Sequence, residues 1–246
     1  MGIVIGTAGW SIARKDFGAF PADGTGLERY SRVFNGVEVN SSFYRPHRVS
    51  TWAKWAASVP DGFRFAVKVP RTITHEARLI DVDMQIAQLA REIESLGPKL
   101  GPLLVQLPPT LRFDASVTER FFTELRTYID AQIVCEPRHV TWFDDGADAL
   151  LERLRVARVA ADPALVPAAA APGGWRGIAY WRLHGSPIMY RSAYPDEAIN
   201  AYARQIRASI DGEHDVWCVF DNTAHFSATG DALSLMAKLR AGDSSD

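Results

Sequence analysis

Short apolar segments alternate with amphipathic segments along almost the whole chain. Eight apolar segments are four to seven residues long and rich in β-branched or aromatic side chains, a pattern typical of strands that are buried on both faces. These predicted strands are residues 3–6, 37–40, 63–69, 102–107, 132–136, 157–161, 178–184 and 216–220.

The segments between them have the period of amphipathic helices. In residues 116–129, for example, apolar side chains recur at three- and four-residue spacings, so they share one helix face. We expect Ser50 to cap one helix, Gly97-Pro98 to end another and Pro195 to occupy a first turn. The predicted helices are residues 27–34, 51–58, 82–96, 116–129, 147–155, 195–210 and 227–239.

Two segments interrupt the alternation. Residues 164–174 read ALVPAAAAPGG, and because proline and glycine punctuate them we predict a flexible excursion rather than a helix. Residues 242–246 are predicted to be a disordered tail.

Eight strands, each followed by a helix or a helical excursion, predict a single (β/α)8 barrel of the TIM type over residues 1–246. An open, doubly wound sheet is the alternative. The chain has neither GxGxxG after its first strand nor GxxxxGK[ST] anywhere, so the two usual nucleotide-binding loops of open sheets are absent.

Composition and charge narrow the class of protein. The chain is 47% hydrophobic, enough for a large core, and its formal net charge of −2 does not suggest a globally basic nucleic-acid binder. Cys135 and Cys218 lie in apolar segments and are predicted to be buried free thiols. With no signal peptide and no apolar run long enough to cross a bilayer, we predict a cytoplasmic protein without membrane contact.

Polar and aromatic side chains gather where the predicted strands end. In a (β/α)8 barrel the C-terminal strand ends and the loops after them build the site, whereas the opposite ends carry mainly Arg64 and Asp215. This asymmetry predicts one site at the C-terminal rim. The residues at that rim are Trp10, Glu38, Asn40, Phe43, Tyr44, Arg45, Lys68, Arg71, His75, Gln106, Glu136, Arg138, His139, Trp142, Asp162, Arg182, His184, Tyr190, Asp221, Asn222 and His225.

The segment 133–143 is the clearest case. Pro137 cannot donate to a strand ladder, so the strand should end near Glu136 and present Glu136, Arg138 and His139 at the rim. An alternative is that Arg138 merely pairs with Glu136 to finish the strand.

Seven segments resemble one known family. They are IGTAGW (5–10), VEVNSSFYR (37–45), FRFAVKVPRTITHE (63–76), GPLLVQLPPTLRFD (101–114), CEPRHVTWF (135–143), YWRLHG (180–185) and FDNTAH (220–225). Together they resemble the DUF72 family, the uncharacterised group that includes YecE-like proteins, over nearly the whole chain. The resemblance implies a TIM-type barrel but no particular reaction. The chain departs from the family pattern at Asp221, where members more often have asparagine, and at Pro137, which bears on how Arg138 is aimed.

The cationic residues suggest an enzyme that acts on an anionic small molecule, phosphorylated or sugar-like. Arginine forks suit carboxylate and phosphate oxygens. Proton transfer would fall to Glu136, His184 and Glu38, as in a hydrolase, an isomerase or a lyase. The remaining candidates would bind or orient the substrate: Lys68, Arg71, Arg182, Asn40, Tyr44, Arg138, Asn222, Trp10 and His75.

Other interpretations stay open at this stage. Lys68 and Arg182 could simply pair with Glu38 and Glu136 to neutralise a polar barrel core. Alternatively, Glu38 and Glu136 could form the carboxylate pair of a glycoside hydrolase, with aromatic side chains stacking on the sugar.

Two further hypotheses concern ligands of another class. The histidines and carboxylates of the rim could hold a divalent metal, although no HxH, HxxxH or DxH pair occurs among them. We therefore predict no cofactor and keep a metal as the weaker hypothesis. The basic, aromatic rim could instead bind single-stranded nucleic acid without catalysis. The oligomeric state cannot be read from the sequence.

Overall fold

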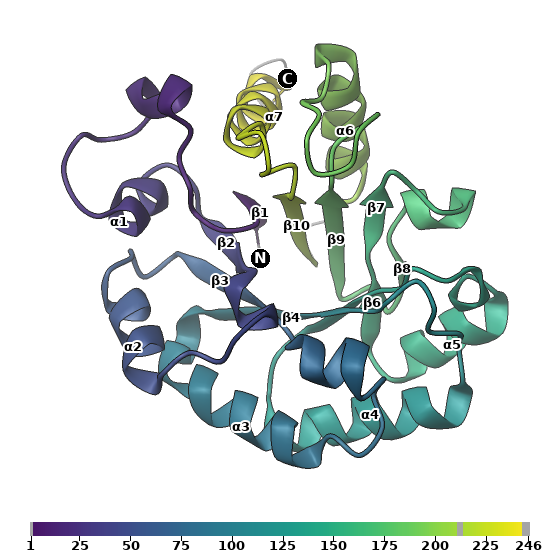
Figure 1. Ribbon diagram of the computed structural model, residues 1–246. Helices are drawn as coiled ribbons and strands as arrows, with labels where there is room; N and C mark the ends of the chain where they lie inside the picture. The colour runs from purple at the N-terminus through teal and green to yellow at the C-terminus, as the bar shows by residue number, and fades with distance from the viewer. Residues whose placement is uncertain (1, 211–213, 243–246) are drawn as a thin grey trace.

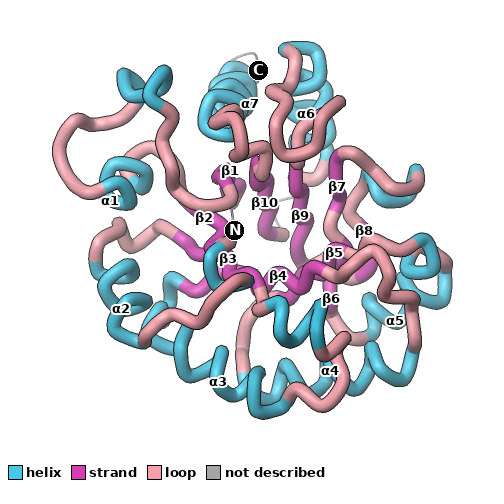
Figure 2. Tube along the Cα trace, in the orientation of Figure 1, coloured by secondary structure: helices cyan, strands magenta, loops and turns pink. Residues whose placement is uncertain are grey.

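The computed structural model describes residues 2–210 and 214–242 and has an α/β architecture. Strands lie at the centre and helices lie outside them (Figures 1 and 2). The strands are β1 (Ile3–Thr7), β2 (Gly36–Val39), β3 (Arg64–Lys68), β4 (Leu100–Gln106), β5 (Ile133–Glu136), β6 (Val156–Arg158), β7 (Ala160–Asp162), β8 (Gly173–Gly174), β9 (Ile178–Leu183) and β10 (Asp215–Phe220). Every predicted strand is present, with bounds within two residues of the prediction.

The strands form two sheets. One has the order β2-β3-β4-β5-β6-β8 and the other β1-β10-β9-β7. All strand pairs are parallel except β6 with β8. The predicted strand 157–161 divides at Val159, because its first part pairs with β5 and its second part with β9. The prediction of one barrel sheet is therefore met in part: the parallel α/β alternation is present, but the strand pairing gives two sheets.

Seven α-helices cover the sheets in the described part of the chain. Helices α2 to α5 lie outside the six-stranded sheet, and α6 and α7 lie outside the four-stranded sheet (Figure 1). They are α1 (Gly26–Ser31), α2 (Val49–Ala57), α3 (Asp83–Ile93), α4 (Ala115–Tyr128), α5 (Asp145–Arg153), α6 (Asp196–Ala208) and α7 (Ala228–Gly242).

The helix ends follow local chemistry, with two corrections. Asp114 caps α4 by accepting a hydrogen bond from the N–H of Val117. The predicted cap at Ser50 is wrong, because α2 already begins at Val49 after Arg48. Pro195 stands one position before the first turn of α6, as its N-cap.

The segment 164–174 is more ordered than predicted. It contains a short 3₁₀ helix, η6 (Pro167–Ala170), and β8, which pairs antiparallel with β6. Gly173 packs directly on the guanidinium of Arg158, and a Cβ added there would lie 2.1 Å from Nη2 of that arginine. The glycines that suggested flexibility instead permit a close approach. Of the predicted tail, Gly242 ends α7 and residues 243–246 lie outside the described residues.

Most of the strands are buried on both faces. Outward-facing residues such as Phe65, Leu103 and Cys218 belong to a large apolar cluster with the helices. Residues on the other face form a smaller cluster that joins the two sheets: Ala8, Ala66, Leu104, Val134, Ala157, Val159, Ile178, Tyr180, Trp217 and Val219. This second cluster packs the two sheets against each other and fixes where their strand ends meet.

Cys135 and Cys218 are buried free thiols, as predicted. Within residues 2–210 and 214–242, no helix is both long enough and apolar enough to span a membrane.

Candidate functional site

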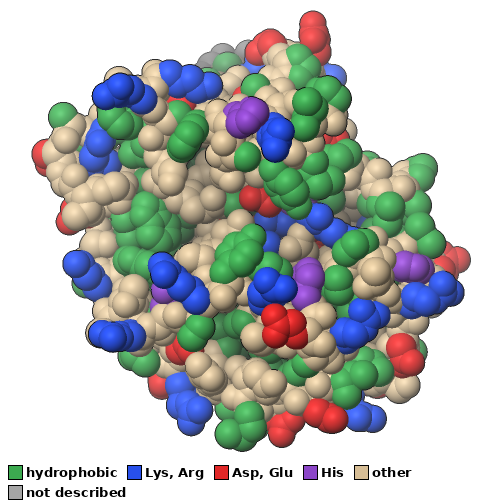
Figure 3. Space-filling view, viewed as in Figure 1, with side chains coloured by type: hydrophobic (Ala, Val, Ile, Leu, Met, Phe, Trp, Pro, Cys, Tyr) green, Lys and Arg blue, Asp and Glu red, His purple; other side chains and the backbone are tan. Residues whose placement is uncertain are grey.

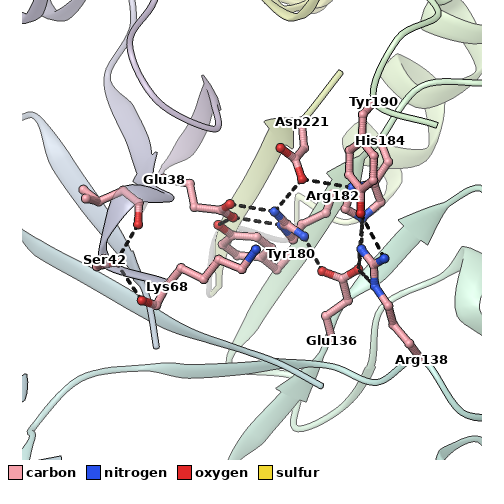
Figure 4. A network of polar contacts seen from close by, with 11 residues as sticks. Glu38, Ser42, Lys68, Glu136, Arg138, Tyr180, Arg182, His184, Tyr190 and Asp221 are labelled. Atoms are coloured by element: carbon pink, nitrogen blue, oxygen red, sulfur yellow. Dashed lines mark hydrogen bonds and ion pairs between the residues drawn. The ribbon is translucent and has the colours of Figure 1, made fainter. Parts of the chain in front are cut away.

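A single buried arginine lies at the centre of the site. Arg182, on β9, is fully buried and bonds to carboxylates from three other segments (Figure 4). Its Nε and Nη2 donate to the two oxygens of Glu38, at 2.9 and 2.7 Å. Its Nη2 also donates to Asp221 at 2.9 Å, and its Nη1 donates to Glu136. The guanidinium is thus enclosed by protein acceptors.

Glu38 is equally enclosed. The carboxylate is fully buried, and besides Arg182 it accepts a hydrogen bond from the hydroxyl of Tyr180 at 3.1 Å. Burial, followed by the charge of Glu38, raises the pKa of Tyr180 well above its usual value, so this hydroxyl keeps its proton. Glu38 therefore holds Arg182 in place and has no oxygen free for a substrate.

His184 bridges two of the same carboxylates. It lies two residues after Arg182 and so shares its side of the strand. Its Nδ1 is 3.1 Å from Asp221 Oδ2, and its Nε2 is 2.9 Å from Glu136 Oε1. Burial alone lowers the pKa of His184, but the charge of Glu136 and the hydrogen bonds to Asp221 and Glu136 together outweigh burial, and the net shift is upward. The imidazolium form is therefore favoured.

Glu136 is held ionised by its neighbours. Burial raises the pKa of this carboxyl group, but Arg182, His184 and Arg138 together lower it well below its usual value. Arg138 donates to Oε1 of Glu136 through Nε and Nη2, at 3.1 and 2.9 Å. The ion pair considered as the alternative for residues 133–143 is thus present, as one part of a larger cluster.

Tyr190 closes the outer side of this cluster. Its hydroxyl accepts a hydrogen bond from Nη1 of Arg138 at 3.0 Å, and its ring meets His184 edge to face at 5.4 Å. Tyr190 has a φ of 67°, a left-handed conformation that is uncommon for a bulky residue. Such backbone strain is often found at functional sites.

Lys68, the last residue of β3, stands apart from these pairs. Its side chain is buried, yet its ammonium makes no hydrogen bond or ion pair with the described residues and instead lies 4.3 Å from the centroid of the Phe43 ring. Burial, followed by repulsion from Arg182, lowers the pKa of Lys68 to about 8, although Glu38 opposes this shift. Lys68 is thus a buried amine without a direct counter-ion.

The side chain of Lys68 lines a cavity of about 470 Å³, here called the cationic cavity. Among the described residues, three Lys or Arg side chains but only one carboxylate line it. In Figure 3, Lys, Arg and His side chains are visible around the middle of this face. The lining residues are Asn40, Phe43, Tyr44, Lys68, Arg71, His75, Gln106, Pro109, Arg138, Tyr190, Asp221 and Thr223.

A second hollow of about 410 Å³, here called the apolar cavity, shares Pro109 and Arg138 with the first. Glu136 and His184 are among its lining residues, so this hydrogen-bonded pair faces the apolar cavity. Its other walls are Pro137, Phe143, Val159, Ala161, Pro163, Ala164, Leu165, Ala169 and Met189.

Most of the predicted site residues converge on these two cavities, and four do not line them. Arg182 and Glu38 lie buried beneath them. Trp10 packs edge to face on Trp55 at 5.0 Å. The side-chain amide of Asn222 donates to the carbonyl of Ser192 and to Asp231.

Three residues of the site, Tyr180, Tyr190 and Asp221, were given no role in the prediction from the sequence. Asp221 follows a strand and Tyr180 lies two residues before Arg182, so strand position and period could have identified both. Tyr190 lies in the loop after β9, where no period predicts a direction. In the described part of the chain, no group of three or more His, Cys, Asp or Glu side chains is arranged to hold a metal ion.

Comparison with known proteins places this fold and these motifs in one family. The family model described as "Protein of unknown function DUF72" matches residues 4–245. The chain belongs to the DUF72 family. The resemblance inferred from the sequence motifs is thereby confirmed.

Two curated relatives carry the family's other designation, UPF0759. YecE of Escherichia coli K12 is 36% identical over 86 residues, which is 35% of this chain and 32% of YecE. YunF of Bacillus subtilis 168 is 29% identical over 149 residues, 57% of this chain and 52% of YunF. The matched segments therefore span only part of each relative's length.

Solved DUF72 structures share the fold over nearly the whole chain. The protein from Thermotoga maritima MSB8 superposes with a TM-score of 0.79 at 20% identity, covering 98% of this chain and 100% of that one. A DUF72 protein from Enterococcus faecalis V583 gives a TM-score of 0.78 at 20% identity, covering 97% and 96%. At this identity the likeness concerns the fold alone, so the roles of the site residues are argued from this chain.

Proposed function

We propose that this DUF72 protein is an enzyme that binds an anionic small molecule in the cationic cavity and transforms it by acid–base chemistry. The observation that carries the proposal is the convergence of Lys68, Arg71 and Arg138 on one cavity beside the buried pair of Glu136 and His184. Perturbed, buried ionisable groups at a concave surface are typical of catalytic sites.

We also propose that the two sheets form one (β/α)8 barrel. Three contacts support this arrangement. Ala8 bridges in parallel to Glu38, the N–H of Gly9 donates to the carbonyl of Glu38 at 2.8 Å, and the N–H of Val159 donates to the carbonyl of Cys135 at 2.8 Å. These contacts connect β1 to β2 and continue β6 into β7. In such a barrel all of the site residues belong to the C-terminal rim.

Anion binding would fall to the residues that face the cationic cavity. Arg71 is half exposed and uses its Nε on Glu76, at 3.1 Å, which leaves the outer part of its fork toward solvent. Lys68 and Arg138 add positive charge deeper in the cavity. Oδ1 of Asn40 is buried without a hydrogen-bond partner among the described residues, and a donor group on a ligand would satisfy it.

Proton transfer would fall to His184 and Glu136 at the wall of the apolar cavity. Because three cations stabilise its ionised form, Glu136 is a weak proton acceptor. His184, which favours the imidazolium form, is the better candidate for a general acid. Arg182 and Glu38 become positioning residues, since both are fully buried.

A thermal-shift screen tests this function. Sugar phosphates, nucleotides, small carboxylates, oligonucleotides and divalent metals are tested with and without a chelator, at two salt concentrations. An anion at about 100 times its dissociation constant should add roughly 2.7 kcal/mol of stability. A stabilisation that tolerates salt supports the small-molecule site, and no stabilisation by any anion argues against it.

Matched variants locate the binding. Arg71→Ala should abolish the shift, because it removes a cation of the cavity. Arg153→Ala should not, although it removes a comparable surface ion pair with Glu119 at 2.7 Å. Equal effects of the two variants would contradict binding in the cationic cavity.

Single-stranded nucleic acid remains the second candidate. A hollow of about 490 Å³ adjoins the cationic cavity and shares Phe43 and Tyr44 with it, and the ring of Tyr44 is exposed. An extended strand could stack there. Stabilisation by oligonucleotides alone, weakening steeply with salt, would favour this function over catalysis.

A further inference from the structure

We propose that Lys68 acts as a nucleophile and forms an imine with an aldehyde or ketone that carries a carboxylate or phosphate group. This inference rests on the proposed function, because the anionic group would be held by the cationic cavity. It narrows the substrate class to 2-oxo acids and phosphorylated sugars or related carbonyl compounds.

The first argument is the isolation of the Lys68 ammonium. The three carboxylates nearest the centre of the site, Glu38, Glu136 and Asp221, all bond to Arg182. The ammonium of Lys68 makes no hydrogen bond or ion pair in the described part of the chain, and it lies over the Phe43 ring. A buried amine left in this state is costly to keep charged unless it is used.

Two other lysines show the contrast. Lys99 is also largely buried, but its ammonium donates to the carbonyls of Ala56 and Val59, both at 2.7 Å. Lys238 pairs with Asp196 at 2.7 Å. Among the lysines that are not exposed, the missing partner is therefore a particular feature of Lys68.

The electrostatic surroundings increase the share of neutral amine. Burial and the nearby Arg182 lower the pKa of Lys68 to about 8, so about one molecule in ten would carry a free amine at pH 7. Desolvation and a neighbouring cation are the two usual means of activating a catalytic lysine. An unperturbed lysine would be almost completely protonated at that pH.

The cavity supplies the other requirements of the reaction. Arg71 and Arg138 line it and can hold the anionic group, while Asn40 and Gln106 offer amide groups to hydroxyl or carbonyl oxygens. Asp221 lines the same cavity and gives only its Oδ2 to Arg182 and His184. Its Oδ1 makes no hydrogen bond with the described residues and is left to accept one from a ligand.

The chemistry balances without an added reagent. The neutral Nζ of Lys68 attacks the carbonyl carbon, a C–N bond forms, and a proton moves from nitrogen to oxygen to give a carbinolamine. A further proton on that hydroxyl lets it leave as water, and the C=N bond forms. The protonated imine then withdraws electrons, so a neighbouring C–H or C–C bond can be broken, as in an isomerase or a lyase.

Reductive trapping tests the proposal. The full chain is incubated with pyruvate, with glyceraldehyde 3-phosphate or with uncharged hydroxyacetone, in the presence of sodium borohydride, and is analysed by intact mass and peptide mapping. We expect one adduct per chain, at Lys68, at least tenfold more abundant with one anionic carbonyl than with hydroxyacetone. Whether the oxo acid or the phosphate ester labels better identifies the anionic group.

Variants separate this proposal from the proposed function. Lys68→Arg keeps the positive charge and should retain the thermal shift with the same anion while losing the adduct. Lys54→Met, at an exposed lysine, should retain both. Circular dichroism establishes that each variant is folded.

The outcomes are distinct. Labelling spread evenly over the lysines, or an adduct that persists in Lys68→Arg, overturns the imine. An anion-dependent thermal shift without any adduct also overturns the imine and leaves the proposed function standing. If neither the shift nor the adduct occurs with any anionic carbonyl, both proposals fail for these ligands.

Discussion

At the scale of single residues, the site is organised by a competition for carboxylates. Arg182 presents five N–H donors in a fixed fork, and it bonds to Glu38, Glu136 and Asp221 at once. Lysine has no such fork, and Lys68 is left without a direct partner. Arg182 therefore has a structural role, whereas Lys68 is available for chemistry.

Replacing Arg182 tests the structural role. Arg182→Met should lower the free energy of unfolding by about 3–5 kcal/mol, because it leaves three buried carboxylates without their common partner. Urea denaturation measures the change, and Arg176→Met, at an exposed arginine, serves as the control. A loss no larger than that of the control would mean that the cluster does not support the fold.

Replacing Lys68 tests whether its charge destabilises the folded protein. A lysine whose pKa is lower in the folded than in the unfolded protein costs stability below its folded pKa, and this cost disappears as pH rises toward the unfolded value. Lys68→Met should therefore stabilise the protein at pH 7 by roughly 1–3 kcal/mol. The gain should shrink between pH 8 and 10.5. A destabilised or pH-independent variant would contradict the buried, charged amine.

The pair of His184 and Glu136 should stabilise the folded protein within a limited range of pH. The raised pKa of His184 contributes stability below 6.5 that is lost as pH rises through its folded value, and the lowered pKa of Glu136 contributes stability above 4.5 that is lost as pH falls. His184→Asn should thus cost about 1–3 kcal/mol near pH 6 and less at pH 9. The exposed His225→Asn is the control, and a cost that grows toward pH 9 would refute the imidazolium form.

At the scale of elements, the approach of β1 to β2 depends on two glycines. A Cβ on Gly6 would lie 2.2 Å from the carbonyl oxygen of Gly36, and a Cβ on Gly36 would lie 2.3 Å from Val4. No side chain fits between these strands. The close approach brings the end of β1 beside Glu38, to which it is connected through Ala8.

Gly6→Ala should disturb this junction. The added methyl group meets backbone, which cannot turn aside, so the strands must separate at a cost of about 1–3 kcal/mol. Gly62→Ala is the matched control, because nothing lies within 4 Å of its Cβ position. Thermal denaturation of the two variants gives the comparison, and a Gly6→Ala protein as stable as the control would mean that β1 and β2 are not closely packed.

At the scale of the whole molecule, the apolar clusters connect the two sheets. Ala66 and Leu104 of one sheet pack in the same cluster as Tyr180 and Trp217 of the other. The large outer cluster likewise includes strands of both sheets. Neither sheet can lose its packing without exposing apolar surface of the other.

We therefore predict cooperative unfolding of the chain as one unit. Urea transitions followed by tryptophan fluorescence and by far-ultraviolet circular dichroism should coincide. The probes are well distributed, since Trp217 lies on β10 and Trp52 on α2. Two separate transitions would indicate two independent domains and would contradict the single domain expected from the sequence.

The sequence by itself determined the elements of this protein. Strand and helix periods are properties of neighbouring residues, so all eight predicted strands were found, and the motifs identified the family. The prediction was weakest where tertiary contacts decide conformation. The strand 157–161 divides at Val159 between two partners, and Gly173 is required by the guanidinium of Arg158.

Only the tertiary structure decided which charges pair. The partners of Arg182 lie 144, 46 and 39 positions away in the chain, and no local pattern specifies such pairs. Because strand ends build the site, the sequence placed Glu136, Arg138 and His184 at the same rim as Lys68. It could not show that each guanidinium nitrogen of Arg182 is engaged, whereas the ammonium of Lys68 has no direct partner among the described residues. That difference arises because the number and direction of donors on each side chain are matched to acceptors only when the strand ends meet.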